Sequence, residues 1–176
     1  MRRVLTAMLV AAPALAAAHP HSYVDQQVQL SLGMDSAQIT VVIVPSANEG
    51  EAIFAHLDRD GDGAISDAEA SAFARAVLDK AALMADGETV KLENAQIAMP
   101  EADAIQGGLG PIRLRADAPL ALAPDTEHEI AFTIGYEDLS HDWFVQPYYH
   151  DDFTAAFPEP GLRRSEDGHE VVITLD

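Results

Sequence analysis

Hydrophobic and polar residues alternate regularly near the start of the chain, in the stretch "YVDQQVQLSL". Every second position falls on one face, which collects Val24, Gln26, Val28, Leu30 and Leu32. A period of two predicts a half-buried strand, and the β-branched stretch "QITVVIV" after the turn "GMDS" predicts a second strand. The two strands are expected to pair as a hairpin.

Helical spacing follows in two stretches on either side of an acidic loop. In "SANEGEAIFAHL", Ile53, Phe54 and Leu57 form an apolar stripe, and Asn48 and Glu51 are spaced as a capping box. The Ala-rich stretch "DAEASAFARAVLDKAALMA" predicts a second helix of about four to five turns. A helix–loop–helix unit is therefore expected at about residues 47–85.

Strand patterns return after this unit. They occur in "DGETVKLENAQIAMP", "GGLGPIRLRAD", "EHEIAFTIGYE" and "HEVVITLD", which are separated by turns rich in Gly, Pro and Asp. About seven strands at this spacing predict a mainly β fold, an immunoglobulin-like antiparallel β-sandwich with the helix–loop–helix inserted after the second strand. Residues 19–176 are expected to form this single domain.

The first residues, "MRRVLTAMLVAAPALAAA", have the pattern of a secretory signal peptide. A basic start at Arg2 and Arg3 precedes an apolar stretch that ends in small residues. Cleavage after Ala18 would remove residues 1–18 and leave His19 as the mature N-terminus, and cleavage after Ala16 satisfies the same rule. The mature protein is expected to be periplasmic and not inserted in a membrane, because no second apolar run has spanning length.

Charge and composition narrow the function further. The chain has 10 basic and 29 acidic residues, a net charge of −19, and loss of Arg2 and Arg3 leaves 8 basic residues and a net charge of −21. Such a surface repels nucleic acid and attracts cations.

There is no cysteine, which excludes disulfides and thiolate metal sites. No Gly-x-Ser-x-Gly turn or phosphate-binding loop occurs, so no catalytic residue or organic cofactor is predicted and the chain is expected not to be an enzyme.

The acidic loop "DRDGDGAISDAE" fits the spacing of a calcium-binding loop without a mismatch. Calcium takes roughly six to eight oxygen ligands, which this spacing supplies from the first, third, fifth, seventh and twelfth positions. The predicted ligands are the side chains of Asp58, Asp60, Asp62 and Glu69 and the backbone carbonyl of Ala64. Gly63 allows the sharp turn. Ser66 and Glu69 also form a capping box, so Glu69 is expected to serve both the metal and the second helix.

A single loop of this kind favours a structural role over a switch. Calcium sensors usually pair two loops and expose a Met-rich groove, whereas this chain has one loop and only Met84 in the flanking stretches. Extracellular modules bind calcium with a Kd of about 10⁻⁴–10⁻³ M, which we expect periplasmic calcium to saturate. The ion is expected to hold the two helices together, with regulation by calcium as the alternative.

Two groups of histidines are candidate ligands for a transition metal, because calcium prefers oxygen. At the mature N-terminus, the amine and imidazole of His19 would chelate a metal with His21 as a further ligand. Pro20 has no N–H, which prevents consecutive amides from wrapping a square-planar ion. The alternative is a solvated tail.

The second group is His141 and His150 in the acidic and aromatic stretch "YEDLSHDWFVQPYYHDDF". Imidazole with carboxylate suits Zn²⁺, Ni²⁺, Co²⁺ and Cu²⁺, so the identity of the metal stays open. The alternative is that the aromatic residues close one end of the sandwich. His56, His128 and His169 are expected to be ordinary residues without a metal role.

These features resemble a broad bacterial group of periplasmic, EF-hand-containing accessory proteins and domains associated with nickel/cobalt-type and related zinc or copper transporters. The resemblance rests on "AHPHSYVD", "LDRDGDGAISDAE", "ADGETVKL" and "EHEIAFTIGYED" and covers most of residues 18–138. It implies a β-rich exported accessory protein that binds calcium in the loop and a transition metal through His19 and His21. Some relatives continue into transmembrane helices, and "LSHDWFVQPYYHDDF" matches no motif of the group.

The sequence therefore predicts a periplasmic metal-binding accessory protein, either a metallochaperone or an accessory to a transporter. Its expected partners are metal ions and a metal permease or its binding protein. A calcium-stabilised interaction module without a transition-metal role is the second hypothesis. A copper-dependent oxidative enzyme with a histidine brace at His19 is the third, and it requires another histidine nearby in space.

Overall fold

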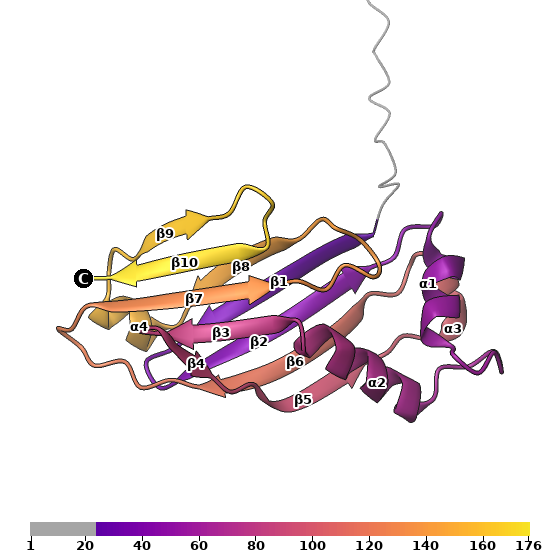
Figure 1. Ribbon diagram of the computed structural model, residues 1–176, viewed down its shortest axis with the longest axis horizontal. Coiled ribbons are helices and arrows are strands. Elements are labelled where there is room, and N and C mark those ends of the chain that lie inside the picture. The colour runs from indigo at the N-terminus through magenta and orange to yellow at the C-terminus, as the bar shows by residue number, and fades with distance from the viewer. Residues whose placement is uncertain (1–23) are drawn as a thin grey trace, which may run out of the picture.

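The structure is a computed structural model that describes residues 24–176 (Figure 1). The predicted signal peptide and the candidate ligands His19 and His21 lie outside the described residues. The described chain is mainly β and forms two five-stranded sheets. Within it, no helix is long and apolar enough to cross a membrane.

The first sheet has the strand order β5-β6-β2-β1-β8. Its strands are β5 (Glu93–Ala98), β6 (Ile112–Pro119), β2 (Ser36–Val44), β1 (Asp25–Leu32) and β8 (Phe144–Tyr149). The predicted hairpin of β1 and β2 is confirmed, with Leu32 paired to Ala37 beside the turn. The other pairs are antiparallel as well, except that β8 runs parallel to β1.

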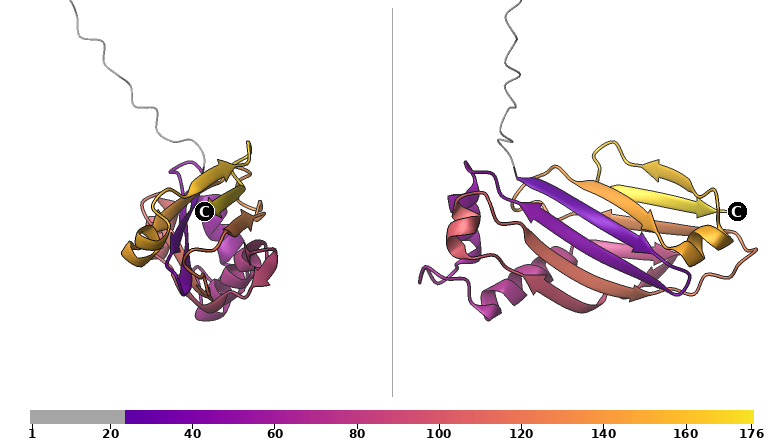
Figure 2. Two further views of the ribbon diagram at one scale, coloured as in Figure 1. Left: turned by 90° about the vertical axis from the view of Figure 1, so that its left-hand side faces the viewer. Right: turned by 180° about the vertical axis from the view of Figure 1, so that it is seen from behind.

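The second sheet has the strand order β4-β3-β7-β10-β9, and all of its pairs are antiparallel. Its strands are β4 (Glu88–Val90), β3 (Ala81–Ala85), β7 (His128–Ile134), β10 (Glu170–Leu175) and β9 (Gly161–Arg164). The two sheets lie as two layers (Figure 2).

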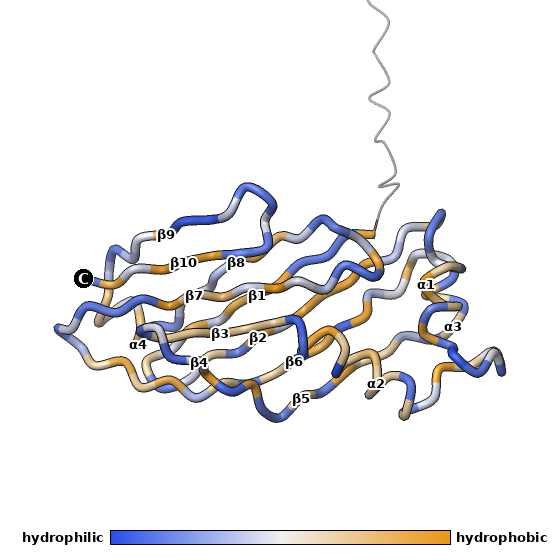
Figure 3. The backbone as a smooth tube through the Cα atoms, viewed as in Figure 1, coloured by the Kyte–Doolittle hydropathy of each residue, from blue (hydrophilic) through white to orange (hydrophobic). Residues whose placement is uncertain are grey.

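Both sheets contribute to one hydrophobic core. Buried residues alternate with more exposed ones along strands such as β1 and β6, and the hydropathy along the chain is drawn in Figure 3. Leu30, Phe132 and Ile173 are fully buried. Phe54 and Phe73 extend this core into the helical end of the molecule. The alternation in the sequence therefore decides which face of each strand is buried.

In the described part of the chain, four helices lie around the sheets: α1 (Gly50–Leu57), α2 (Asp67–Leu78), α3 (Ala102–Gln106) and α4 (Asp151–Ala156). Helices α1, α2 and α3 lie at one end of the molecule and α4 lies toward the other end (Figure 1). Helices α1 and α2 follow β2 and flank the acidic loop, as the sequence predicts.

Three details of the sequence prediction are wrong. The second helix ends at Leu78 rather than near residue 85. Residues 81–85 form strand β3 instead, because they pair with β7 on one side and β4 on the other and bury Leu83. The capping box of Asn48 and Glu51 is absent. Helix α1 begins without a side-chain cap, and the carbonyl of Ser46 accepts the N–H groups of Glu49 and Gly50 instead. Among residues 24–176 there are ten strands rather than about seven.

Candidate metal centre

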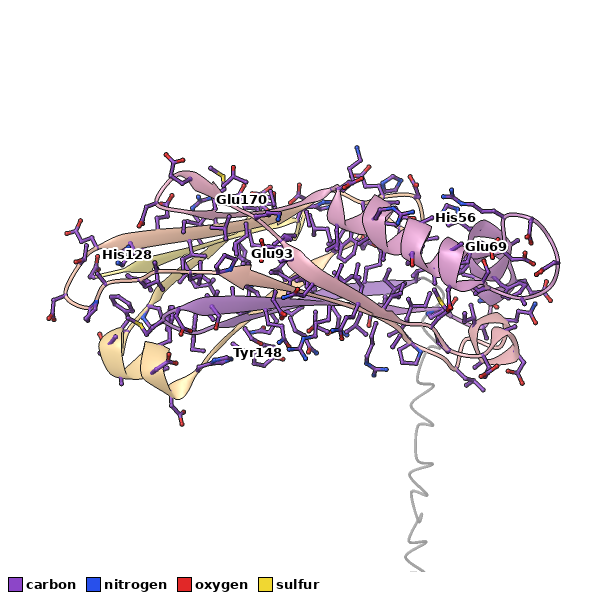
Figure 4. The ribbon with its side chains drawn as sticks, turned by 90° about the horizontal axis from the view of Figure 1, so that it is seen from below. His56, Glu69, Glu93, His128, Tyr148 and Glu170 are labelled. Carbon is purple, nitrogen blue, oxygen red and sulfur yellow. The ribbon has the colours of Figure 1, made fainter. Side chains whose placement is uncertain are left out.

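Three carboxylates meet in the loop between α1 and α2. Asp58, Asp60 and Glu69 each offer one oxygen, and these oxygens lie within 4.8 Å of one another. Asp58 directly follows α1, and Glu69 lies in the first turn of α2 (Figure 4). Within the described residues, no other group of three histidines or acids comes close enough to share one ion.

The carboxylate of Asp58 organises the loop. Its Oδ1 accepts the N–H groups of Gly61 at 2.8 Å and Asp62 at 3.2 Å, and its Oδ2 accepts the N–H of Gly63 at 2.9 Å. Gly61 and Gly63 have φ angles of 72° and 86°, a left-handed conformation that favours glycine. The glycines therefore let the backbone turn around Asp58, which is almost fully buried.

The carboxylate of Glu69 joins the loop to α2. Its Oε1 accepts the N–H groups of Arg59 at 2.7 Å and Asp60 at 3.3 Å. Its Oε2 accepts the N–H and the hydroxyl of Ser66 at 2.9 and 2.8 Å, while the Ser66 hydroxyl accepts the N–H of Glu69. The predicted capping box of Ser66 and Glu69 is thus confirmed, and Glu69 is fixed in the carboxylate cluster by the same contacts.

The electrostatics of the cluster suit a cation. Hydrogen bonds from the N–H and hydroxyl of Ser66, and from the N–H of Arg59, lower the pKa of Glu69 to about 2. The N–H of Asp62 lowers the pKa of Asp60, but repulsion from the carboxylates of Asp62, Glu69 and Asp58, together with desolvation, outweighs it and raises the pKa overall. Because like charges crowd around Asp60, a bound cation would relieve their repulsion.

The two remaining predicted ligands lie further along the loop. Asp62 is not part of the group of three, and its Oδ1 accepts the N–H of Ala64 at 2.9 Å. The roles of the Asp62 side chain and of the Ala64 carbonyl stay predictions. Ile65, the next residue, is half-buried and packs against the core. With only oxygen donors available, the loop fits a hard cation such as Ca²⁺.

His141 and His150 do not form one site. They lie at opposite ends of β8, whose six residues span about 20 Å. His141 is exposed, and its Nδ1 lies 3.2 Å from Oε2 of Glu137. His150 precedes α4, and its N–H donates to the carbonyl of Leu32. The sequence placed both histidines in one candidate group, and the length of β8 is the reason that they cannot share an ion.

A pocket lies beside His141, at the point where the described chain begins. It is lined by Val24, Glu49, Leu139, Ser140, His141 and Asp142. The buried amide of Gln26 donates to the carbonyls of Ser140 at 2.8 Å and Asp142 at 3.2 Å. Within the described structure, Oε1 of Gln26 has no hydrogen-bond partner. This end of β1 therefore holds the loop that carries His141.

The other histidines make specific contacts that the sequence did not reveal. His128 lies at the opposite end of the molecule from His56 and Glu69 (Figure 4), and its Nδ1 is 2.7 Å from Oδ2 of Asp86. Nε2 of His56 lies 3.1 Å from the hydroxyl of Tyr136. Tyr136 was not singled out from the sequence, because no local pattern marks a tyrosine that contacts a residue 80 positions away.

Neither the family models nor the curated proteins that were compared match this chain. Membership of the transporter-associated group therefore stays a prediction from the sequence.

Proposed function

We propose that this chain is an exported, periplasmic metal-binding accessory protein. In this proposal, one EF-hand loop inserted into an immunoglobulin-like β-sandwich binds Ca²⁺ and stabilises the fold. Histidines near the N-terminus and on the loop before β8 bind Zn²⁺, Ni²⁺, Co²⁺ or Cu²⁺, and the protein acts as a metallochaperone or an accessory to a metal transporter. The observation that carries the proposal is the convergence of Asp58, Asp60 and Glu69 within 4.8 Å.

The calcium part is supported by agreement between motif and geometry. The motif requires carboxylates at its first, third and twelfth positions, and these three residues form the cluster. The turn glycines and the capping box hold the cluster in place through contacts within the chain. A site organised in this way gains affinity because less ordering is needed on binding.

The transition-metal part is supported by the position of His141. Glu137 and His141 provide one carboxylate oxygen and one imidazole nitrogen 3.2 Å apart. Val24 lines the adjacent pocket, and His21 is three residues before it. The proposal therefore combines His21 with Glu137 and His141. His150, at the far end of β8, has no place in this set.

The calcium part is tested on the protein secreted with its own signal and without a tag. Calcium content is measured by mass spectrometry and calcium affinity by isothermal titration calorimetry. We expect one Ca²⁺ per chain in the wild type and loss of that binding in Asp58→Asn. The variant Asp67→Asn, which removes a neighbouring acid outside the predicted ligand set, is expected to bind Ca²⁺ normally. Failure of the wild type to bind Ca²⁺ would contradict the proposal.

The transition-metal part is tested on the same material with Zn²⁺, Ni²⁺, Co²⁺ and Cu²⁺. We expect His141→Ala and the double variant His19→Ala/His21→Ala to weaken binding, and His150→Ala to leave it unchanged. If no transition metal binds more tightly than a Kd of about 10 μM, the role is that of a calcium-stabilised interaction module. Peroxide-dependent oxidation with bound copper would favour the copper enzyme.

A further inference from the structure

The helices around the acidic loop contact one buried tyrosine of the loop between β7 and β8, residues 135–143. Tyr136 is almost fully buried, and its hydroxyl lies 3.1 Å from Nε2 of His56. His56 is in the last turn of α1, two residues before the carboxylate of Asp58. The end of α1 and the β7–β8 loop are therefore linked directly beside the calcium motif.

Helix α2 contacts the same tyrosine. The ring of Phe73 packs edge-on against Tyr136 at 5.8 Å between centroids, and edge-on against His56 at 6.4 Å. Tyr136 thus touches a residue from each of the two helices that flank the acidic loop. A change in the angle between α1 and α2 has to move or repack these three rings, because close-packed interiors leave little free space.

On its other side, Tyr136 is connected to the candidate transition-metal ligands. Its carbonyl accepts the indole N–H of the buried Trp143 at 2.7 Å, which fixes both ends of the β7–β8 loop. The next residue, Glu137, is paired with His141. The link from Asp58 to His141 is thus made of two contacts, His56 with Tyr136 and Glu137 with His141, joined by short stretches of chain.

We propose that calcium binding in the acidic loop is transmitted through His56 and Tyr136 to the β7–β8 loop, and changes the affinity of His141 and Glu137 for a transition metal ion. The inference rests on the proposed function, because it requires both ions to bind. Drawing Asp58 and Glu69 onto one ion would set the end of α1 against the start of α2. In calcium sensors the same event moves a helix pair from a closed to an open arrangement. Coupling of this kind is reciprocal, so the transition metal changes calcium affinity by the same factor.

The first test uses the single tryptophan of the chain and needs no transition metal. Trp143 is the only tryptophan of the chain, so tryptophan emission reports on the β7–β8 loop alone. We expect calcium titration of the metal-free protein to shift the Trp143 emission with the same midpoint as calcium binding measured by calorimetry. In Tyr136→Phe, which keeps the ring and removes the hydroxyl, calcium binds but the shift is lost. Tyr148→Phe is the matched control: Tyr148 is half-exposed on β8, away from the acidic loop (Figure 4), and keeps the shift.

The second test measures the affinity for Ni²⁺ and for Zn²⁺ with and without saturating calcium. Coupling free energies between sites usually correspond to roughly fivefold or larger changes, so we expect at least that factor in the wild type and in Tyr148→Phe. In Tyr136→Phe we expect less than about twofold. Absence of calcium binding, or of binding to all four transition metals, overturns the proposed function and the coupling with it, and absence of Ni²⁺ and Zn²⁺ binding alone overturns the coupling to these two ions. If calcium and the transition metals bind but neither the emission nor the affinities respond to calcium, only the coupling is overturned.

Discussion

Oε1 of Glu69 accepts the N–H of Arg59 at 2.7 Å and thereby ties the first turn of α2 to the start of the acidic loop. Oε2 of the same carboxylate completes the cap of α2 with Ser66. One side chain therefore closes the loop, begins the helix and offers an oxygen to a cation. Removing its charge tests all three roles.

Replacing Glu69 by Gln is expected to lower calcium affinity by roughly tenfold or more, because affinity in such loops depends on the number of charged ligands. Thermal unfolding with saturating calcium should occur at a lower temperature than in the wild type, since less binding energy supports the folded state. Calorimetry and a thermal scan measure the two effects. Glu51→Gln, a change of the same chemistry in the first turn of α1, should leave both unchanged. Normal calcium affinity in Glu69→Gln would show that this carboxylate is not a ligand.

The lowered pKa of Glu69 predicts a pH dependence in the calcium-free protein. A folded pKa of about 2 lies below the ordinary value of 4.5, so the folded state favours the ionised carboxylate. Its contribution to stability is present above pH 4.5 and is lost as the pH falls toward 2. We expect the difference in urea midpoint between the wild type and Glu69→Gln to shrink over this range. A constant difference would mean that the hydrogen bonds of Glu69 do not depend on its charge.

His169 predicts a pH dependence of the opposite sign. Its Nδ1 lies 2.6 Å from the carbonyl of Ile134 and its Nε2 lies 2.8 Å from the carbonyl of His141, so only the doubly protonated ring donates to both. Partial burial lowers its pKa, but the two carbonyls and the carboxylates of Asp167 and Glu137 outweigh it and raise the pKa above 6.5.

The contribution of His169 is therefore complete below about pH 6.5 and is lost as the pH rises through its folded pKa. We expect the urea midpoint of the wild type to fall between about pH 6 and pH 8, and to fall less in His169→Gln. The variant His150→Gln, which changes an exposed histidine, should follow the wild type. If the urea midpoints of the wild type and His169→Gln changed in parallel with pH, the stabilising role of the protonated His169 would be contradicted.

The parts of the structure that depend on local sequence could be predicted. The β1–β2 hairpin follows from alternation, and the capping box at Ser66 and Glu69 follows from a spacing of three residues. The clustering of the three acids follows from a loop motif of twelve residues. In each case the residues that interact are near neighbours in the chain.

The parts that depend on long-range pairing could not be predicted. The stretch 81–85 has the composition of a helix, yet it becomes β3 because β7 and β4 lie on either side of it. Strand β8 contains Pro147, which lacks an N–H and argues against a strand, and it pairs at the sheet edge with β1 from more than a hundred residues away. The separation of His141 from His150 follows from that pairing.

Gly50 provides a test of the packing that places α1. A side-chain carbon at this buried position would collide with the carbonyl oxygens of Ile105 and Gln106, because α1 begins directly against α3. We expect Gly50→Ala to lower the free energy of unfolding by about 1–3 kcal/mol, since overpacking forces the backbone to shift. Urea denaturation followed by circular dichroism measures the change. Gly135→Ala is the matched control, because an added carbon there meets only the carbonyl of Lys80 at an ordinary contact distance of 3.8 Å. Equal stability of the two variants would show that α1 and α3 do not approach as closely as described.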